Sequence, residues 1–176
     1  MDYPCALLRP AALILTACLA MLSDIRTGRI PNRFLLCSFA AAFLLQVLPS
    51  GMAGALRFLG GTAPALLFLA PLFRFRMIGA GDIKLLGVLG AYLDLRGSLL
   101  LLAVSVFCGA AAALFRMLRL GMLRERFRYF FRYVRLLSAG GPAVPYRLPG
   151  RRPEHICFSV PVFAASLLAV FLPRLS

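Results

Sequence analysis

Two aspartates stand out as residues that could carry out a reaction. Asp24 and Asp82 each lie at the end of an apolar run, and ionisable side chains at membrane depth are costly enough to indicate function. When two carboxyls share a site, their titrations separate, so that one is ionised while the other keeps its proton. The ionised one can take a proton from water, and the neutral one can donate to the oxygen of a substrate carbonyl. The pair is therefore a candidate for hydrolysis of a peptide bond.

Charge placement alone leaves a second interpretation open. Arg26 follows Asp24 by two residues, and Lys84 follows Asp82 by two residues. Such acids and bases can pair with each other at the ends of membrane helices. Ion pairs of this kind would anchor the helix ends at the interface without any catalysis.

Histidine and cysteine are weaker candidates. His155 is the only histidine, and its position beside the last apolar run favours a structural role. The five cysteines form no CxxC pair, so they predict neither a disulfide framework nor a zinc site. We expect no metal and no cofactor.

The composition indicates a membrane protein. The chain has 176 residues, of which 61% are hydrophobic and 15% are charged, against about 25% charged in a typical soluble domain. A soluble protein of this length cannot bury so much apolar surface, because its surface-to-volume ratio is too high. The net charge of +14 does not indicate nucleic-acid binding, since the basic residues lie between apolar runs. We expect a single integral membrane domain over 1–176.

Apolar segments predict an all-α, polytopic protein of about six transmembrane helices. About 20 residues cross the ~30 Å hydrocarbon core, or fewer where flanking Arg side chains snorkel. Pro49-Ser50-Gly51 and Asp94-Leu95-Arg96-Gly97 predict breaks between helices. The N-terminal Met-Asp-Tyr-Pro carries an acid and no base, and three arginines follow the first apolar part. This is the reverse of a secretory signal, so we expect the first segment to be retained. The expected helices are 5–22, 34–49, 54–73, 78–93, 97–117 and 155–172.

The basic residues predict the orientation of these helices. Sixteen of the 20 lie in 23–33, 74–84 and 116–153, and the other four lie in the alternate segments. Short loops rich in Lys and Arg stay in the cytoplasm. Six crossings then place both termini outside and both Asp24 and Asp82 at the cytoplasmic face.

The longest basic segment, 118–153, has two parts. Over 118–138, apolar residues recur at helical spacing among arginines, which is typical of an amphipathic helix lying on anionic headgroups. A loop that only sets the topology is an equally good interpretation. The remainder, 139–153, is rich in Gly and Pro and is expected to be irregular.

Two glycines precede the second aspartate in Gly79-Ala80-Gly81-Asp82. Glycine permits a bent backbone and the close approach of another chain. An extended substrate needs that approach, because its backbone must find hydrogen-bond partners in a site that excludes water. Opposite a second aspartate on the same membrane face, this GxGD motif favours a peptidase over helix anchoring.

Two segments resemble the signatures of the type IV prepilin peptidases, the GxGD aspartyl proteases of the bacterial inner membrane. They are SDIRTGRIPNRF (23–34) and MIGAGDIKLLGVLGAY (77–92). The resemblance implies an aspartic-type endopeptidase that removes leader peptides from prepilins or pseudopilins at the cytoplasmic face. It makes Asp24 and Asp82 the catalytic pair, and the other motif residues are Ile30, Pro31, Asn32, Gly79, Gly81 and Lys84.

The resemblance is limited in extent. It covers about residues 10–118, whereas 119–153 and the final helix match poorly. The larger members of the family carry a cytoplasmic segment with paired cysteines and an N-methylating activity. This chain has no such segment, so it is similar to the short peptidases linked to tight-adherence, or Flp-type, pili.

Two other functions have less support. An intramembrane protease of the presenilin or signal-peptide-peptidase type shares GxGD, but this chain is short and has no Tyr-Asp motif. A non-enzymatic transporter, or a scaffold for pilus or secretion assembly, could place an acid pair on a proton path. Transporters typically have inverted repeats and polar groups at the midplane, and the sequence shows no internal repeat.

Overall fold

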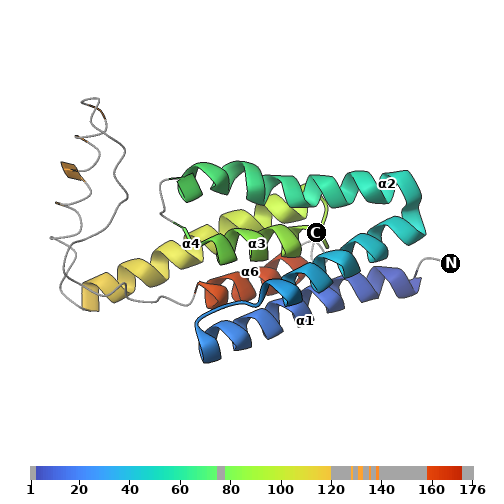
Figure 1. Cartoon of the computed structure of the whole chain (residues 1–176), viewed down its shortest axis with the longest axis horizontal. Helices are drawn as coiled ribbons and strands as arrows, with labels where there is room; N and C mark the ends of the chain where they lie inside the picture. Colours follow the sequence, from blue (N-terminus) through green and yellow to red (C-terminus); the bar gives the residue numbers. More distant parts are fainter. Residues whose placement is uncertain are drawn as a thin grey trace.

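The described part of the chain is entirely helical. The computed structural model describes residues 3–74, 78–119 and 158–171, and the single positions 128, 131, 132, 135 and 138. Within these residues there is no strand, which confirms the all-α prediction. Figure 1 shows the helices side by side; their bounds are α1 Tyr3–Thr27, α2 Asn32–Arg74, α3 Ala80–Gly90, α4 Leu95–Arg119 and α6 Ser159–Phe171.

The second element, α2, is bent in the middle. Gly51 within it has φ 53° and ψ −127°, a backbone conformation that favours glycine. Two arms, 32–50 and 52–74, meet at this residue, and Figure 1 shows the second arm running back along the molecule. The break predicted at Pro49-Ser50-Gly51 is confirmed, because the non-helical backbone of Gly51 separates two helical arms.

The two arms of α2 pack directly against each other. Gly54 leaves no room for a side chain, because a Cβ there would overlap the carbonyl oxygen of Gln46. Phe58 of the second arm contacts Phe39 and Phe43 of the first, with ring centroids 4.8 and 5.2 Å apart. Aromatic pairs at this separation are stabilising beyond the burial of their area. The arms therefore form a close hairpin.

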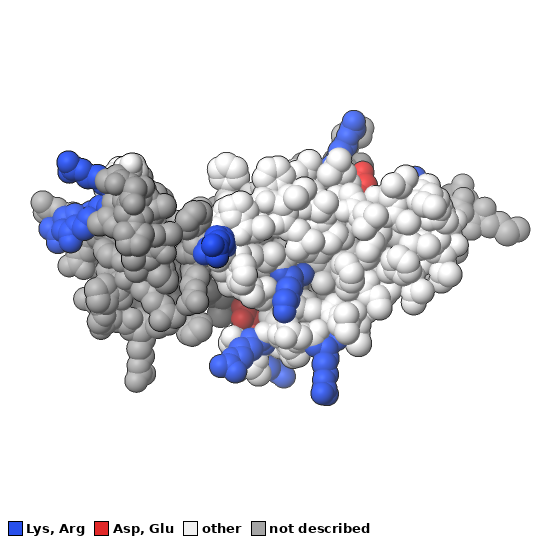
Figure 2. All heavy atoms as spheres, turned by 45° about the horizontal axis from the view of Figure 1, so that its top comes forward, with Lys and Arg blue, Asp and Glu red and all other residues white. Residues whose placement is uncertain are grey.

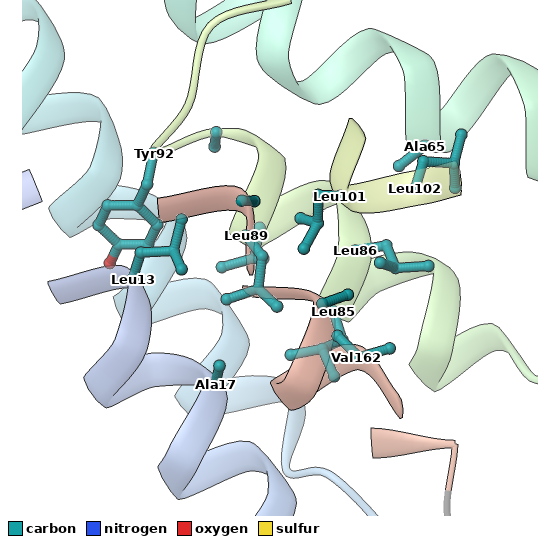
Figure 3. Packing of buried hydrophobic residues seen from close by; sticks show 14 of the residues in the cluster. Leu13, Ala17, Ala65, Leu85, Leu86, Leu89, Tyr92, Leu101, Leu102 and Val162 are labelled. Atoms are coloured by element: carbon teal, nitrogen blue, oxygen red, sulfur yellow. The ribbon is translucent and has the colours of Figure 1, made fainter. Parts of the chain in front are cut away.

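The shortest helix, α3, lies at the centre of the core. Its side chains from Ile83 to Leu89 are buried, apart from Lys84, as is typical of a helix that is apolar on every side. Residues of the other described helices surround it (Figure 3); they include Leu13, Ala17, Ala65, Leu101, Leu102 and Val162. Any displacement of α3 would therefore disturb the whole bundle.

Hydrogen bonds fix the C-terminal end of α3. Gln46 donates from Nε2 to the carbonyl oxygens of Ala91 and Leu93 at 2.8 and 3.1 Å. The Tyr92 hydroxyl donates to the carbonyl oxygen of Ser38 at 2.8 Å. Buried polar groups need such partners, and these hold the end of α3 against the first arm of α2. They also set the position of the opposite end of α3, where Asp82 lies.

The boundaries of the later helices differ from those predicted. The Oδ1 of Asp94 accepts a hydrogen bond from the N–H of Gly97 at 2.9 Å, which is the bond of a helix N-cap. Helix α4 therefore begins at Leu95, and the break after α3 falls at 91–94. At the ends of the chain, α1 extends beyond the predicted 5–22, and residues 155–157 of the last predicted helix lie outside the described part.

Among the described residues, three helices are long and apolar enough to cross a membrane. These are α1 over Leu8–Thr27, the whole of α2, and α4 over Leu95–Arg116. Figure 2 shows that the visible face of the described helices is largely uncharged, and large apolar side chains such as Leu48, Met52 and Phe107 are more than three-quarters exposed. Extensive exposed apolar surface indicates a lipid environment. The described helices form the bundle of a membrane protein.

The short helices do not match the expected spans. The 11 residues of α3 rise only about 16 Å and the 13 of α6 about 20 Å, against a hydrocarbon core of about 30 Å. The described residues therefore do not confirm the six predicted crossings. The predicted interfacial helix at 118–138 and the irregular segment at 139–153 lie outside the described residues, apart from Leu118, Arg119 and the single positions named above.

Candidate active site

The two aspartates lie at the same end of the bundle, on different helices. Asp24 is in the last turn of α1 and Asp82 is in the first turn of α3, and Figure 1 shows both of these helix ends on the left-hand side of the bundle. Both line one pocket of about 430 Å³. The other lining residues are Gly28, Arg29, Ile30, Asn32, Gly79, Ala80, Gly81, Lys84 and Phe158.

The end of α1 is shaped so that the chain returns to the pocket. Gly28 has φ 63° and donates its N–H to the carbonyl oxygen of Asp24 at 2.8 Å, as in a left-handed helix C-cap. The hydroxyls of Ser23 and Thr27 both lie within hydrogen-bond distance of the carbonyl oxygen of Arg29, at 3.1 and 2.9 Å. These bonds fold the connection over the end of α1. As a result, Ile30 reaches the same pocket as Asp24.

The start of α2 completes the first motif. The carbonyl oxygen of Pro31 accepts a hydrogen bond from the N–H of Leu35 at 3.2 Å, so Pro31 caps the N-terminus of α2. Asn32 then occupies the first position of the helix, with its side chain at the pocket. Pro31 therefore has a structural role at the turn, while its neighbours Ile30 and Asn32 line the site.

The GxGD motif forms a helix N-terminus. Gly79 is the N-cap of α3, with φ −70° and ψ 142°, and Asp82 is the third residue of the helix. The Asp82 carboxyl accepts a hydrogen bond from the Gly79 backbone, which is the reciprocal bond of a capping box. The motif thus holds the carboxyl in one orientation at the mouth of the pocket.

Burial and a neighbouring charge favour the protonated form of Asp82. Burial and, to a lesser extent, the negative charge of Asp24 raise the pKa of Asp82 from 3.8 to about 6, against the opposing effect of the Gly79 hydrogen bond. Desolvation and a like charge each disfavour the ionised form. The charge of Asp24 thus acts on Asp82 within the pocket that both residues line.

The two glycines of the motif have different surroundings. A Cβ on Gly79 would lie 3.1 Å from Oδ2 of Asp82, so a side chain there would press on the carboxyl. A Cβ on Gly81 would meet nothing within 4 Å. Gly79 therefore makes room for the aspartate, and Gly81 leaves open space at the pocket wall.

Asp24 has a partner that sequence reasoning missed. The Ser159 hydroxyl, at the start of α6, donates to Oδ2 of Asp24 at 2.6 Å. Ser159 is 1% exposed, and its neighbour Phe158 lines the pocket. Nothing local in the sequence marks this serine, because it begins an apolar run 135 residues away from Asp24.

The ion pairs considered from the sequence are not formed in the described part of the chain. No base there lies within ion-pair distance of Asp24 or Asp82; the ammonium of Lys84 instead donates to Oδ1 of Asn32 at 3.1 Å. The described residues also contain no group of three or more His, Cys, Asp or Glu that could hold a metal ion. The geometry does not favour helix anchoring by Arg26 and Lys84.

The arrangement agrees with one comparison with known proteins. The sequence model of the type IV leader peptidase family matches residues 11–114, a range that contains both motifs and both aspartates. Comparisons with curated proteins and with solved structures give no match. The family match covers more than half of the chain, and on this basis the protein belongs to the type IV leader peptidase family.

Proposed function

We propose that the chain is a membrane aspartyl endopeptidase that removes the leader peptide from type IV prepilin-like proteins, with Asp24 and Asp82 as its catalytic pair. The observation that carries this proposal is that two carboxyls, from helices far apart in sequence, line one pocket. Burial and the charge of Asp24 raise the pKa of Asp82 in this pocket to about 6. Paired carboxyls with separated titrations are the requirement for acid and base catalysis in one site.

The environments of the two aspartates suggest their roles. The raised pKa of Asp82 favours its protonated form, so Asp82 would donate to the carbonyl oxygen of the scissile bond. Asp24, held through Oδ2 by Ser159, would take a proton from the attacking water. As the C–N bond breaks, Asp24 passes this proton to the leaving amine, and Asp82 recovers its own from the collapsing intermediate. Neither step requires a cofactor.

A second pocket is suited to bind an apolar segment of the substrate. This pocket of about 440 Å³ adjoins the first, since Asn32 and Lys84 line both. Its other lining residues are mostly apolar: Leu35, Leu36, Phe39, Thr62, Leu66, Gly87 and Val88. A peptide with its scissile bond at the aspartates could extend along α3 and place apolar side chains here.

The proposed site faces the cytoplasm of a bacterial inner membrane. Each arm of α2 is about 28–34 Å long, enough to cross once, so the ends of α1 and of the second arm lie on the same side. This sidedness of Asp24 and Asp82 does not depend on whether α3 or α6 also crosses. Helix ends that carry many basic residues stay in the cytoplasm and attract anionic headgroups. The described basic residues at the end of the bundle that holds Asp24 and Asp82 are Arg26, Arg29, Arg33, Arg74, Lys84, Arg116 and Arg119.

Cleavage by the purified protein tests the proposed activity. The protein in detergent is mixed with a prepilin-like substrate, and the products are identified by intact mass. We expect a single cut at the end of the leader. Intact substrate, or cutting at scattered positions, would count against the proposal.

Reporter fusions test the orientation independently of activity. Fusions after residues 30, 80 and 135 should all report the cytoplasm. A periplasmic signal at residue 80 would separate Asp82 from Asp24 and would overturn the shared site.

A further inference from the structure

We propose that Ser159 is a positioning residue for Asp24, so that the C-terminal helix α6 forms part of the active site. The hydroxyl of Ser159 donates to Oδ2 of Asp24 at 2.6 Å, a length typical of an O–H donor on a charged carboxylate. The inference rests on the proposed assignment of Asp24 to the catalytic pair. It adds a residue that lies beyond the stretch matched to the family, which ends at 114.

The bond would control which oxygen of Asp24 is available. A carboxylate has two oxygens, and Ser159 occupies Oδ2 from the protein side. Asp24 also lines the pocket, so Oδ1 is the oxygen left for water. A general base must hold its accepting atom within hydrogen-bond reach of the proton that it removes. Fixing the rotation of the Asp24 carboxylate would meet that condition before the substrate arrives.

The serine itself is held rigidly. It is the first residue of α6, is 1% exposed, and is followed by the buried residues Pro161 and Val162. The N-terminus of a helix carries partial positive charge, which attracts a carboxylate. Ser159 therefore presents a fixed donor and a favourable electrostatic field to Asp24.

The contact between α6 and α4 sets the position of this serine. A Cβ on Gly109 of α4 would overlap Cε2 of the Phe158 ring, so the two helices approach closely here. Phe158 precedes Ser159 directly and also lines the pocket. The packing of α6 thus determines both the wall of the site and the place of the donor.

A second serine of α6 shows how a buried hydroxyl is satisfied without a role at the site. Ser166 is fully buried like Ser159, but it donates within its own helix to the carbonyl oxygen of Phe163 at 2.7 Å. Ser166 is therefore a matched control. Ser166→Ala removes a buried hydroxyl from the same helix and leaves the hydrogen bond to Asp24 intact.

The test compares kcat, KM and thermal unfolding of full-length variants in detergent, with a prepilin-like substrate. Ser159→Ala should lower kcat by about 10- to 100-fold, as expected for a hydrogen bond to a charged group, and should change KM by less than about threefold. Ser166→Ala should keep the wild-type kcat. An equal kcat for Ser159→Ala and Ser166→Ala would overturn the inference.

An isosteric pair of variants at position 159 separates the effect of the hydroxyl from the effect of side-chain packing. Ser159→Thr keeps the donor and Ser159→Val removes it with nearly the same shape, so Ser159→Thr should retain most of kcat while Ser159→Val should lose it. If Ser159→Ala fails to fold, the Thr and Val variants still decide, and equal kcat in these two would overturn the inference. Asp24→Asn distinguishes the two proposals: if it is inactive while Ser159→Val is fully active, only the role of Ser159 is wrong. If Asp24→Asn remains active, the proposed function fails as well.

Discussion

Lys84 of α3 donates a hydrogen bond from its ammonium to Oδ1 of Asn32 in α2, at 3.1 Å and across 52 residues of sequence. This bond joins the two segments that resemble the prepilin peptidase signatures. It also gives Lys84 a partner other than an aspartate. The lysine therefore links the two halves of the proposed site instead of neutralising Asp82.

The hydrogen bond between Lys84 and Asn32 predicts that Asn32→Ala and Lys84→Ala lose activity in a coupled way. Each variant removes one side of the same hydrogen bond, so each should lower kcat/KM, by about 5- to 20-fold for a bond to a charged group. The double variant should be little worse than either single one, because residues in direct contact are not additive. Rates of leader cleavage by the three proteins measure this. Losses that simply multiply would show that the two residues act separately.

The raised pKa of Asp82 predicts an activity that declines toward alkaline pH. The proposed role of Asp82 requires its protonated form, and its pKa is about 6. The protonated fraction therefore falls about tenfold per pH unit above that value, and kcat/KM should fall with it. Initial cleavage rates between pH 5 and 8.5, with a substrate that does not titrate in this range, measure the profile. A rate that rises through this interval would contradict the role assigned to Asp82.

The same pKa predicts a stability gain on removal of the charge. A carboxyl whose folded pKa, about 6, exceeds the unfolded value of 3.8 contributes stability below pH 3.8 that is lost as pH rises through 6. Asp82→Asn should therefore be more stable than the wild type at pH 8, by on the order of 1–2 kcal/mol after allowance for solvent screening. Near pH 4 the two should unfold alike. Thermal unfolding in detergent at both pH values measures this, and a gain that is the same at both would exclude the charge as its cause.

Substitutions of the two glycines of the GxGD motif should impair activity in different ways. A Cβ on Gly81 meets open space, so Gly81→Ala should fold normally and raise KM by narrowing the room for a substrate backbone. A Cβ on Gly79 lies 3.1 Å from Oδ2 of Asp82, so Gly79→Ala should displace the carboxyl and lower kcat. Steady-state kinetics of the two variants separate these effects. If Gly81→Ala lowered only the unfolding temperature, the glycine would be structural.

Much of the helical framework could be predicted from the sequence, because long apolar runs leave few alternatives in a membrane. The break at Pro49-Ser50-Gly51 was also predictable, since proline and glycine mark such positions locally. The length of α3 was not. Its apolar sequence continues through Ala91 to Leu93, and only hydrogen bonds from Gln46 and Tyr92 to distant residues show that the chain has already turned.

The proposed active site, like the fold, could be predicted from the sequence only in part. The placement of Asp24 and Asp82 in one pocket could be predicted from charge and motif, because both cues are local. The Ser159 contact depends on how α6 packs against α1 and α4, and a serine within an apolar run does not reveal its partner. The partner of Lys84 was likewise hidden, since Asp82 is nearer in sequence than Asn32.

The most direct test of the account is leader cleavage by Asp24→Asn and Asp82→Asn, with Asp94→Asn as control. Asn keeps the size of Asp but can neither take a proton from water nor donate one as a carboxylic acid does. Asp94 caps α4 away from the pocket, and Asn caps a helix as well as Asp does, so this variant should keep near-normal activity.

Each of the two pocket variants should remain folded, as judged by its unfolding temperature in detergent, and should lose all measurable cleavage. The double variant should be no worse than either single one, because residues that act as a unit fail together. A folded Asp82→Asn protein that cuts the leader at the wild-type rate would contradict the central claim.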